Sequence, residues 1–252
     1  MQSAGVTPHD IETIERATVA TVSPENTEEI DGWLLAFDRG TIGRAKSAVP
    51  LAHRESAAGL IGRIEVRYES HGFPAMFRIA DLSCFHSLQQ ALRDAGYHAD
   101  RHSLVQIARA SDVRELVAEP QAHIASRPDE AWGRVFLGEG FDPVDGASRV
   151  RALRRTPDAV YASIRTADGN DALASGAASF AQGWASIHAM RTALAHRRKG
   201  LAGRILAALA RAAIDRGFER IFLQVEENNI GAKSLYRRAG FGTAWRYEYW
   251  SR

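Results

Sequence analysis

The stretch Arg197-Arg198-Lys199-Gly200-Leu201-Ala202-Gly203 decides how this 252-residue chain folds. It follows a strand-like segment, 184–194, and leads into a segment whose apolar residues recur at helical spacing. We therefore predict a strand–helix turn, whose backbone N–H groups are the unpaired donors of a helix N-terminus. Gly200, Ala202 and Gly203 let a ligand approach the backbone closely. Together with three basic side chains, these donors suit a phosphate, and a pyrophosphate better than a carboxylate.

A second block of residues follows the turn at regular spacing. After a predicted buried strand, 221–225, the chain places Asn229, Ala232, Leu235-Tyr236 and Gly240-Phe241 along a short helix and its end. Taken alone, the turn is a weak signal, because small residues at a strand–helix junction often serve packing and a basic run is often a solvated face. The two blocks in this order are a more specific sign of function than either block alone.

Together the two blocks resemble the motifs of the GNAT superfamily of acyl-CoA-dependent N-acyltransferases. The family's turn pattern, Arg/Gln-x-x-Gly-x-Gly/Ala, is matched by Arg197, Gly200 and Ala202. Its second pattern, Asn-x-x-Ala-x-x-Leu-Tyr-x-x-x-Gly-Phe, is matched over 229–241. The strong similarity covers about 187–241, and a weaker fit of strand order extends it back to about residue 111.

The resemblance implies an α/β (α+β) GNAT fold, a mixed splayed sheet flanked by helices that opens a V-shaped cleft below the turn. Acetyl-CoA would be the co-substrate, with its pantetheine arm along the preceding strand like an added strand. Its pyrophosphate would rest on the turn, and no metal is expected. The implied cofactor-binding residues are Met190, Arg191, Thr192, Arg197, Arg198, Lys199, Gly200, Leu201, Ala202, Gly203, Asn229, Ala232 and Tyr236.

The same resemblance implies an N-acetyltransferase in which an amine attacks the thioester directly. A backbone N–H near Thr192 would polarise the carbonyl, and Tyr236 would protonate the leaving sulfur as general acid. The general base stays open, because the strand before the turn contains no glutamate. Glu226 is the candidate at the end of the next strand and His188 is the alternative, although a lone residue of either type is more often structural.

The first half of the chain resembles a second, degenerate GNAT copy, as in tandem members of the superfamily. The segments 71–73 and 216–218 line up, each after a predicted helix, and 93–97 lines up with 237–241. The alternative is that any helix–glycine–strand sequence would align this well. We predict two domains, 1–110 and 111–252, with 111–120 as the junction.

If the repeat is real, the first copy has lost the residues that carry chemistry. This alignment places Glu55 where the second half has Gly200, and Leu92 where it has Tyr236. The first domain would then complete the acceptor pocket or cover a sheet face. Cys84 lies in this half without an assembled set of catalytic partners, and we interpret it as structural.

The composition sets the limits of these hypotheses. Hydrophobic residues make up 45% of the chain and charged residues 25%, and the formal charge is only +2, which disfavours a nucleic-acid or membrane partner. A single cysteine, no membrane-length apolar run and no signal pattern in Met1 to Asp10 predict a cytoplasmic protein. We expect a monomer or homodimer that acts on a small-molecule or peptide amine. A non-catalytic acyl-CoA-binding sensor or scaffold is the alternative.

Apolar periodicity predicts the remaining elements. Segment 33–37 is predicted to form a hairpin with 41–49, and 104–108 to be the last strand of the first half. Further helices are predicted at 8–21, 60–69, 87–95, 129–137 and 145–154, and further strands at 75–80, 159–166, 173–182 and 245–250.

Overall fold

In a computed structural model, which describes residues 5–57 and 59–252, the chain forms one mixed sheet flanked by helices. Over these residues eleven strands follow the order β1-β2-β3-β4-β11-β5-β10-β9-β8-β7-β6. The strands are β1 (Asn26–Ile30), β2 (Trp33–Phe37), β3 (Ala48–Pro50), β4 (Phe77–Ala80), β5 (His98–Arg109), β6 (His123–Ala125), β7 (Ala159–Arg165), β8 (Ala172–Ala181), β9 (Trp184–Thr192), β10 (Arg220–Glu226) and β11 (Gly242–Ser251). The helices are α1 (Pro8–Val22), α2 (Leu60–Ser70), α3 (His86–Asp94), α4 (Ala110–Arg114), α5 (Glu130–Arg134), α6 (Pro143–Arg154), α7 (Leu201–Ile214) and α8 (Ile230–Arg238), with short 3₁₀ turns η1 (Gly43–Ala45), η2 (Ser83–Phe85) and η3 (Leu194–His196).

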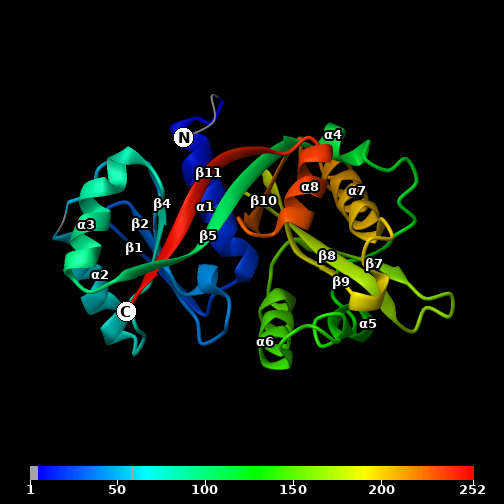
Figure 1. The fold of residues 1–252 in the computed structure, drawn as a ribbon, viewed down its shortest axis with the longest axis horizontal. Helices are drawn as coiled ribbons and strands as arrows, with labels where there is room; N and C mark the ends of the chain where they lie inside the picture. The colour runs from blue at the N-terminus through cyan, green and yellow to red at the C-terminus, as the bar shows by residue number, and fades with distance from the viewer. Residues whose placement is uncertain (1–4, 58) are drawn as a thin grey trace.

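The two halves of the chain repeat one arrangement of elements. The series β3-α2-β4-α3-β5 corresponds to β9-α7-β10-α8-β11, and β3 and β4 pair in parallel as β9 and β10 do. The final strands of the halves, β5 and β11, pair antiparallel with each other. Each also pairs with the other half, β5 with β10 and β11 with β4, so the halves exchange their last strands. Figure 1 shows β5 and β11 running together from one half to the other.

The helices that precede the exchanged strands end in the same way, which fixes the alignment of the halves. After α3, Tyr97 donates its N–H to the carbonyl of Leu92 at 2.9 Å, and after α8, Phe241 donates to the carbonyl of Tyr236 at 3.0 Å. In both, a glycine with positive φ stands between helix and aromatic residue. Leu92 therefore holds the place of Tyr236, as the sequence alignment predicted.

The predicted equivalence of Glu55 and Gly200 is wrong. Helix α2 has 11 residues and α7 has 14, so an alignment made from the helix ends slips at the helix beginnings. Gly59 precedes α2 as Gly200 precedes α7, but Gly59 has φ −65° and Gly200 has φ +77°. The two turns therefore differ in backbone conformation as well as in charge.

The predicted hairpin of 33–37 with 41–49 is only partly right. Strand β2 pairs with β1 through a turn at Asp31-Gly32, where both residues have positive φ, the two-residue turn that Asp-Gly favours. Within 41–49 the chain forms η1, and only the end of the segment, in β3, pairs with β2. Strand β5 begins six residues before the predicted 104–108, because its exposed first residues are polar and carry no apolar signal. The short strand β6 was not predicted.

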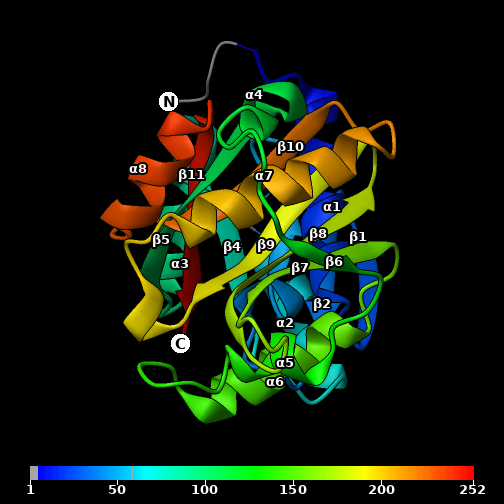
Figure 2. The ribbon, with the colours of Figure 1, turned by 90° about the vertical axis from the view of Figure 1, so that its right-hand side faces the viewer.

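The predicted boundary near residue 110 falls at the start of α4, but the sheet continues across it. Strand β11 lies between β4 and β5, and its Trp245 and Trp250 are buried in the core of the first half. The division into 1–110 and 111–252 stays a prediction, with residues 1–4 and 58 outside the described part. Figure 2 shows α7 lying across the strands of the second half, with α5 and α6 together at one end.

Candidate active site

A cleft opens where β9 and β10 stop pairing. The two strands are in parallel register only from Ala185 opposite Ile221 to Ile187 opposite Leu223. Beyond this point β9 contains a bulge, since three steps along β9 face two steps along β8, and Ala189 has φ +56°. A bulge bends its strand away from the neighbour. The splayed sheet implied by the GNAT resemblance is therefore confirmed, and its separation begins at His188.

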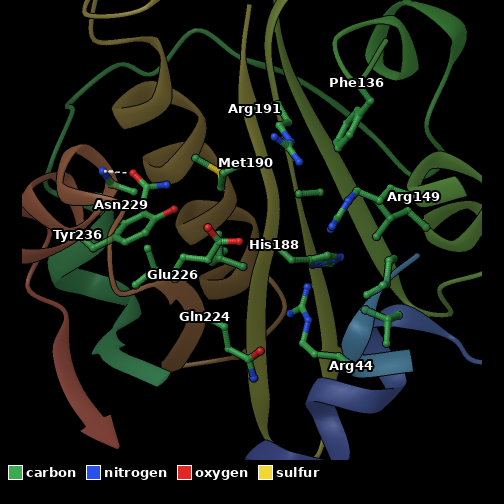
Figure 3. A pocket seen from close by; sticks show the side chains of 17 residues that line it. Arg44, Phe136, Arg149, His188, Met190, Arg191, Gln224, Glu226, Asn229 and Tyr236 are labelled. Atoms are coloured by element: carbon green, nitrogen blue, oxygen red, sulfur yellow. Dashed lines mark hydrogen bonds between the residues drawn. The ribbon is translucent and has the colours of Figure 1, made fainter. Parts of the chain in front are cut away.

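Two adjoining hollows occupy the cleft, and we call them the cofactor groove and the inner pocket. Five residues line both: Met190, Arg191, Asn229, Ala232 and Tyr236. The cofactor groove is further lined by Phe141, Thr192, His196, Arg197, Arg198, Gly200, Leu201, Ala202, Gly203, Gly231, Leu235 and Arg238. The inner pocket has a volume of about 250 Å³ and is further lined by Val22, Ile42, Arg44, Phe136, Arg149, Leu153, Ile187, His188, Ala189, Gln224, Val225 and Glu226 (Figure 3).

All the predicted cofactor-binding residues except Lys199 line the cofactor groove. Lys199 is exposed and lies outside the lining. The structure thus brings the two sequence blocks together on one surface, while the binding role of these residues stays a prediction.

The turn before α7 presents unpaired donors to the groove. No side chain caps α7, and among the described residues the N–H groups of 198–202 have no hydrogen-bond partner. Arg198 and Gly200 have φ +62° and +77°, a sequence of left-handed residues that turns N–H groups toward one side. A methyl group placed on Gly200 would meet nothing within 4 Å. The space in front of these donors is open for an anion.

Helix α8 positions Asn229 and Tyr236. The Asn229 side-chain oxygen accepts the N–H of Ala232 at 3.1 Å, which caps the helix and leaves the amide NH₂ as a donor. Tyr236 is 6% exposed, and burial raises the pKa of its hydroxyl to about 12. Figure 3 shows the hydroxyl directed into the pocket toward Glu226. The group is therefore protonated at any physiological pH.

The two candidate bases differ in their surroundings. Glu226 is the exposed last residue of β10 and lines the inner pocket. His188 is buried, its Nδ1 lies 3.4 Å from the carbonyl oxygen of Ser186, and burial together with the charge of Arg44 lowers its pKa to about 3. A histidine with this pKa is neutral at pH 7 but holds a proton weakly. Glu226 is the candidate whose side chain is exposed at the pocket, where an amine or a water molecule has access to it.

No local pattern in the sequence marks the arginines of the inner pocket. Arg44 comes from η1 in the first half and Arg149 from α6 in the second. Contacts across the halves hold these elements together: Thr41 donates its hydroxyl to Asp145 at 2.6 Å, and Asp145 also accepts from Arg149 at 2.6 Å. Spacing along the chain cannot reveal a pocket wall that two distant segments build.

The described residues contain no group of three His, Cys, Asp or Glu side chains placed to hold a metal ion. None of the described helices is both long and apolar enough to cross a bilayer.

Comparisons with known proteins agree with this geometry. The model of a protein family described as "Probable histone acetyltransferase Rv0428c C-terminal" matches residues 8–250. A Bacillus subtilis (strain 168) protein described as "Uncharacterized N-acetyltransferase YobR" is 27% identical over 244 residues, which are 95% of this chain and 98% of that protein. Among solved structures, a GCN5-related N-acetyltransferase from Kribbella flavida superposes with a TM-score of 0.71 at 15% identity, covering 99% of this chain and 96% of the other. A tandem GNAT protein from the clavulanic acid biosynthesis pathway superposes with a TM-score of 0.60 at 12% identity, covering 95% and 87%.

Fold, cleft and relatives define a GNAT-type N-acetyltransferase, a class of enzymes that act on amine acceptors. Within that class, the chain belongs to the family described as "Probable histone acetyltransferase Rv0428c C-terminal", because the match runs over nearly the whole described chain.

Proposed function

We propose that the protein transfers an acetyl group from acetyl-CoA to a primary amine of a small molecule or peptide, with the second half as the catalytic domain. The observation that carries this proposal is that one groove is lined both by the turn with unpaired N–H groups and by Tyr236. The turn is suited to the pyrophosphate of CoA. Asn229 and the stretch Met190–Thr192 lie between the turn and the inner pocket, where the pantetheine arm would run.

In the proposed reaction the amine nitrogen attacks the thioester carbonyl carbon from the inner pocket. A backbone N–H of the bulged strand after Ala189 polarises the carbonyl oxygen. Glu226 accepts the proton of the amine, directly or through a water molecule. The C–N bond forms, the C–S bond breaks, and Tyr236 gives its hydroxyl proton to the departing thiolate. Solvent then returns a proton to Tyr236.

The first half is proposed to be non-catalytic. Leu92 occupies the place of Tyr236, and the turn before α2 has neither the left-handed glycine nor the basic run of its counterpart. Its contribution to the site is Val22, Ile42 and Arg44, which close the inner pocket. We place the reaction in the cytoplasm, in keeping with the single cysteine, and expect a monomer or homodimer.

The test is release of free CoA thiol from acetyl-CoA in the presence of a panel of amines and short peptides. Thiol release that depends on both amine and protein, with the acetylated amine identified by mass, is the expected result. Acetyl-CoA at about a hundred times its dissociation constant should also stabilise the fold by roughly 2.7 kcal/mol. Stabilisation without thiol release for any amine would indicate a sensor or scaffold instead.

A further inference from the structure

The inner pocket carries more positive charge than amine acetylation requires. Its charged lining consists of three arginines, Arg44, Arg149 and Arg191, and one carboxylate, Glu226. An acceptor amine arrives largely as an ammonium ion, which an arginine-lined pocket repels. The excess of positive charge therefore calls for a negative group on the ligand.

Arg44 is the arginine least accounted for by the protein itself. It is partly buried, and no hydrogen bond or ion pair within the described residues reaches its guanidinium. Burial lowers its pKa, and the Tyr247 and Tyr249 hydroxyls offset part of that shift. Arginine stays charged under all physiological conditions, so a guanidinium partly withdrawn from water without a counterion costs stability unless a ligand supplies one.

The two other arginines are positioned but have unused hydrogen-bonding capacity. Arg149 is held by Asp145 through one contact at 2.6 Å, which leaves its other N–H groups directed to the pocket. Arg191 lies over the ring of Phe141, 4.5 Å from its centre, and makes no hydrogen bond to a described side chain. A stacked guanidinium keeps its donors in the ring plane free for a ligand.

The cofactor does not explain Arg44 and Arg149. Both line the inner pocket, and neither lines the cofactor groove or borders the donor turn. Figure 3 shows them on either side of the neutral His188, across the pocket from Glu226 and Tyr236. One side of the pocket thus attracts an anion, while the opposite side holds the groups proposed to handle the amine and the thioester.

We propose that the acceptor is an amine that also carries an acidic group, a carboxylate or a phosphate, which Arg44 binds together with Arg149 and Arg191. This inference rests on the proposed acetyl transfer. The volume of about 250 Å³ fits a compact amino acid or amino phosphate, or the end of a longer chain. The first half then determines specificity, because Arg44 is the charged residue that it contributes to the pocket.

The test compares acceptors that differ in one charge. A series of ω-amino carboxylates of increasing length is assayed against the corresponding amides, and O-phosphoethanolamine against ethanolamine. The series makes the result independent of the unknown spacing between amine and anion, and the phosphate pair separates the two anion types. We expect higher kcat/KM for the anionic member of at least one pair; equal or higher values for every neutral member overturn the inference.

Variants of Arg44 test whether the preference for anionic acceptors depends on this residue. Arg44→Gln should lower kcat/KM for the anionic acceptor by about ten- to a hundredfold, mainly through KM, because it removes hydrogen bonds to a charged group. Arg44→Lys should restore part of the loss, and acetyl-CoA affinity should be the same in both variants as in the wild type, because Arg44 does not line the cofactor groove. Arg54→Gln, an exposed arginine of the same half, is the matched control. An unchanged ratio of anionic to neutral turnover in Arg44→Gln contradicts the proposal.

Calorimetry separates this inference from the proposed function. The same acceptor pairs are titrated into the protein saturated with CoA. If no amine is acetylated but anionic members bind and Arg44→Gln abolishes their binding, the proposed function fails and the anion site stands. If amines are acetylated but anionic and neutral members bind equally, the proposed function stands and the anion site fails.

Discussion

The turns before α2 and before α7 hold the same place in two similar halves, with different chemistry. The three residues before Gly59 read Ser-Ala-Ala, and the three before Gly200 read Arg-Arg-Lys. The glycine before α2 has ordinary helical φ, and the one before α7 is left-handed. Both turns connect a strand to a helix and a further parallel strand. The fold therefore tolerates either turn, and the donor geometry before α7 is a property that packing alone does not require.

The ends of α3 and α8 also share one conformation but differ in one side chain. The backbone carbonyls of Leu92 and Tyr236 each accept the N–H of a following aromatic residue, and both side chains are buried. Leucine satisfies the packing there, so the hydroxyl of Tyr236 is the difference between the halves. We predict that Tyr236→Phe lowers kcat by about 10²–10⁴-fold, the usual contribution of a positioned acid, with little change in acetyl-CoA affinity.

The measurement for Tyr236 is steady-state thiol release over a range of pH. Because the pKa of Tyr236 is raised to about 12 by burial, the wild-type protein should show no fall in rate from its ionisation below pH 10. The variant's rate should be lower by the same factor throughout that range. Tyr97→Phe, which removes a hydroxyl at the corresponding helix end of the first half, should leave kcat unchanged; equal kcat in Tyr236→Phe and wild type removes this residue from the mechanism.

The second prediction makes the same substitution in both turns. Gly200→Glu places a carboxylate in the open space before the donor turn, where it repels the pyrophosphate and fills its site. We expect acetyl-CoA affinity to fall about a hundredfold or more, since charge-assisted contacts are replaced by like-charge repulsion. Binding is measured by calorimetry.

Gly59→Glu is the matched control for that substitution. Its position before α2 is exposed, and a methyl group there meets nothing within 4 Å. Acetyl-CoA affinity should stay at the wild-type value, and melting curves of both variants show whether the fold survives. If both variants lose affinity equally, the two turns do not differ in the way proposed.

Sequence reasoning found the elements whose patterns are local. The donor turn, the Asn229-to-Phe241 block and the helix–glycine ends are short-range patterns, and the turn and the block line one groove in the structure. It failed where distant segments meet. The exchange of β5 and β11 depends on strand pairing, and the placement of Arg44 depends on contacts such as the Thr41–Asp145 hydrogen bond. Both join segments more than a hundred residues apart, which no local periodicity encodes. The Asp31-Gly32 turn was a local signal that could have been recognised.

The third prediction compares one histidine from each half, the partly buried His53 and the buried His188. Burial and nearby arginine charge lower the pKa of His53 to about 4 and that of His188 to about 3, against about 6.5 in an unfolded chain. Well above pH 6.5 each histidine is neutral in both states, so neither makes stability depend on pH. As the pH falls below 6.5 the unfolded chain takes up the protons first, so the native state loses stability.

Each histidine should steepen the loss by up to about 1.4 kcal/mol per pH unit over its own window. That window ends near pH 4 for His53 and near pH 3 for His188. Urea unfolding at pH 7, 5.5 and 4.5 tests this, with His188→Asn and His53→Asn each expected to flatten the dependence. A slope unchanged from wild type in either variant shows that the histidine protonates in the native state.

The smallest expected effect concerns the charge of the donor turn. Arg198 lines the cofactor groove, whereas its exposed neighbour Lys199 does not. Arg198→Ala keeps the left-handed backbone equally strained and removes one exposed cation, so acetyl-CoA affinity should fall about two- to fivefold, within the range of an exposed ion pair. The difference should shrink between 0.05 and 0.5 M salt, because mobile ions screen exposed charges. Lys199→Ala should change affinity less at every salt concentration. Equal losses in the two variants mean that the basic run acts only through its total charge. A larger loss in Arg198→Ala indicates a directed contact, for which the Ser-Ala-Ala sequence before Gly59 offers no basic side chain.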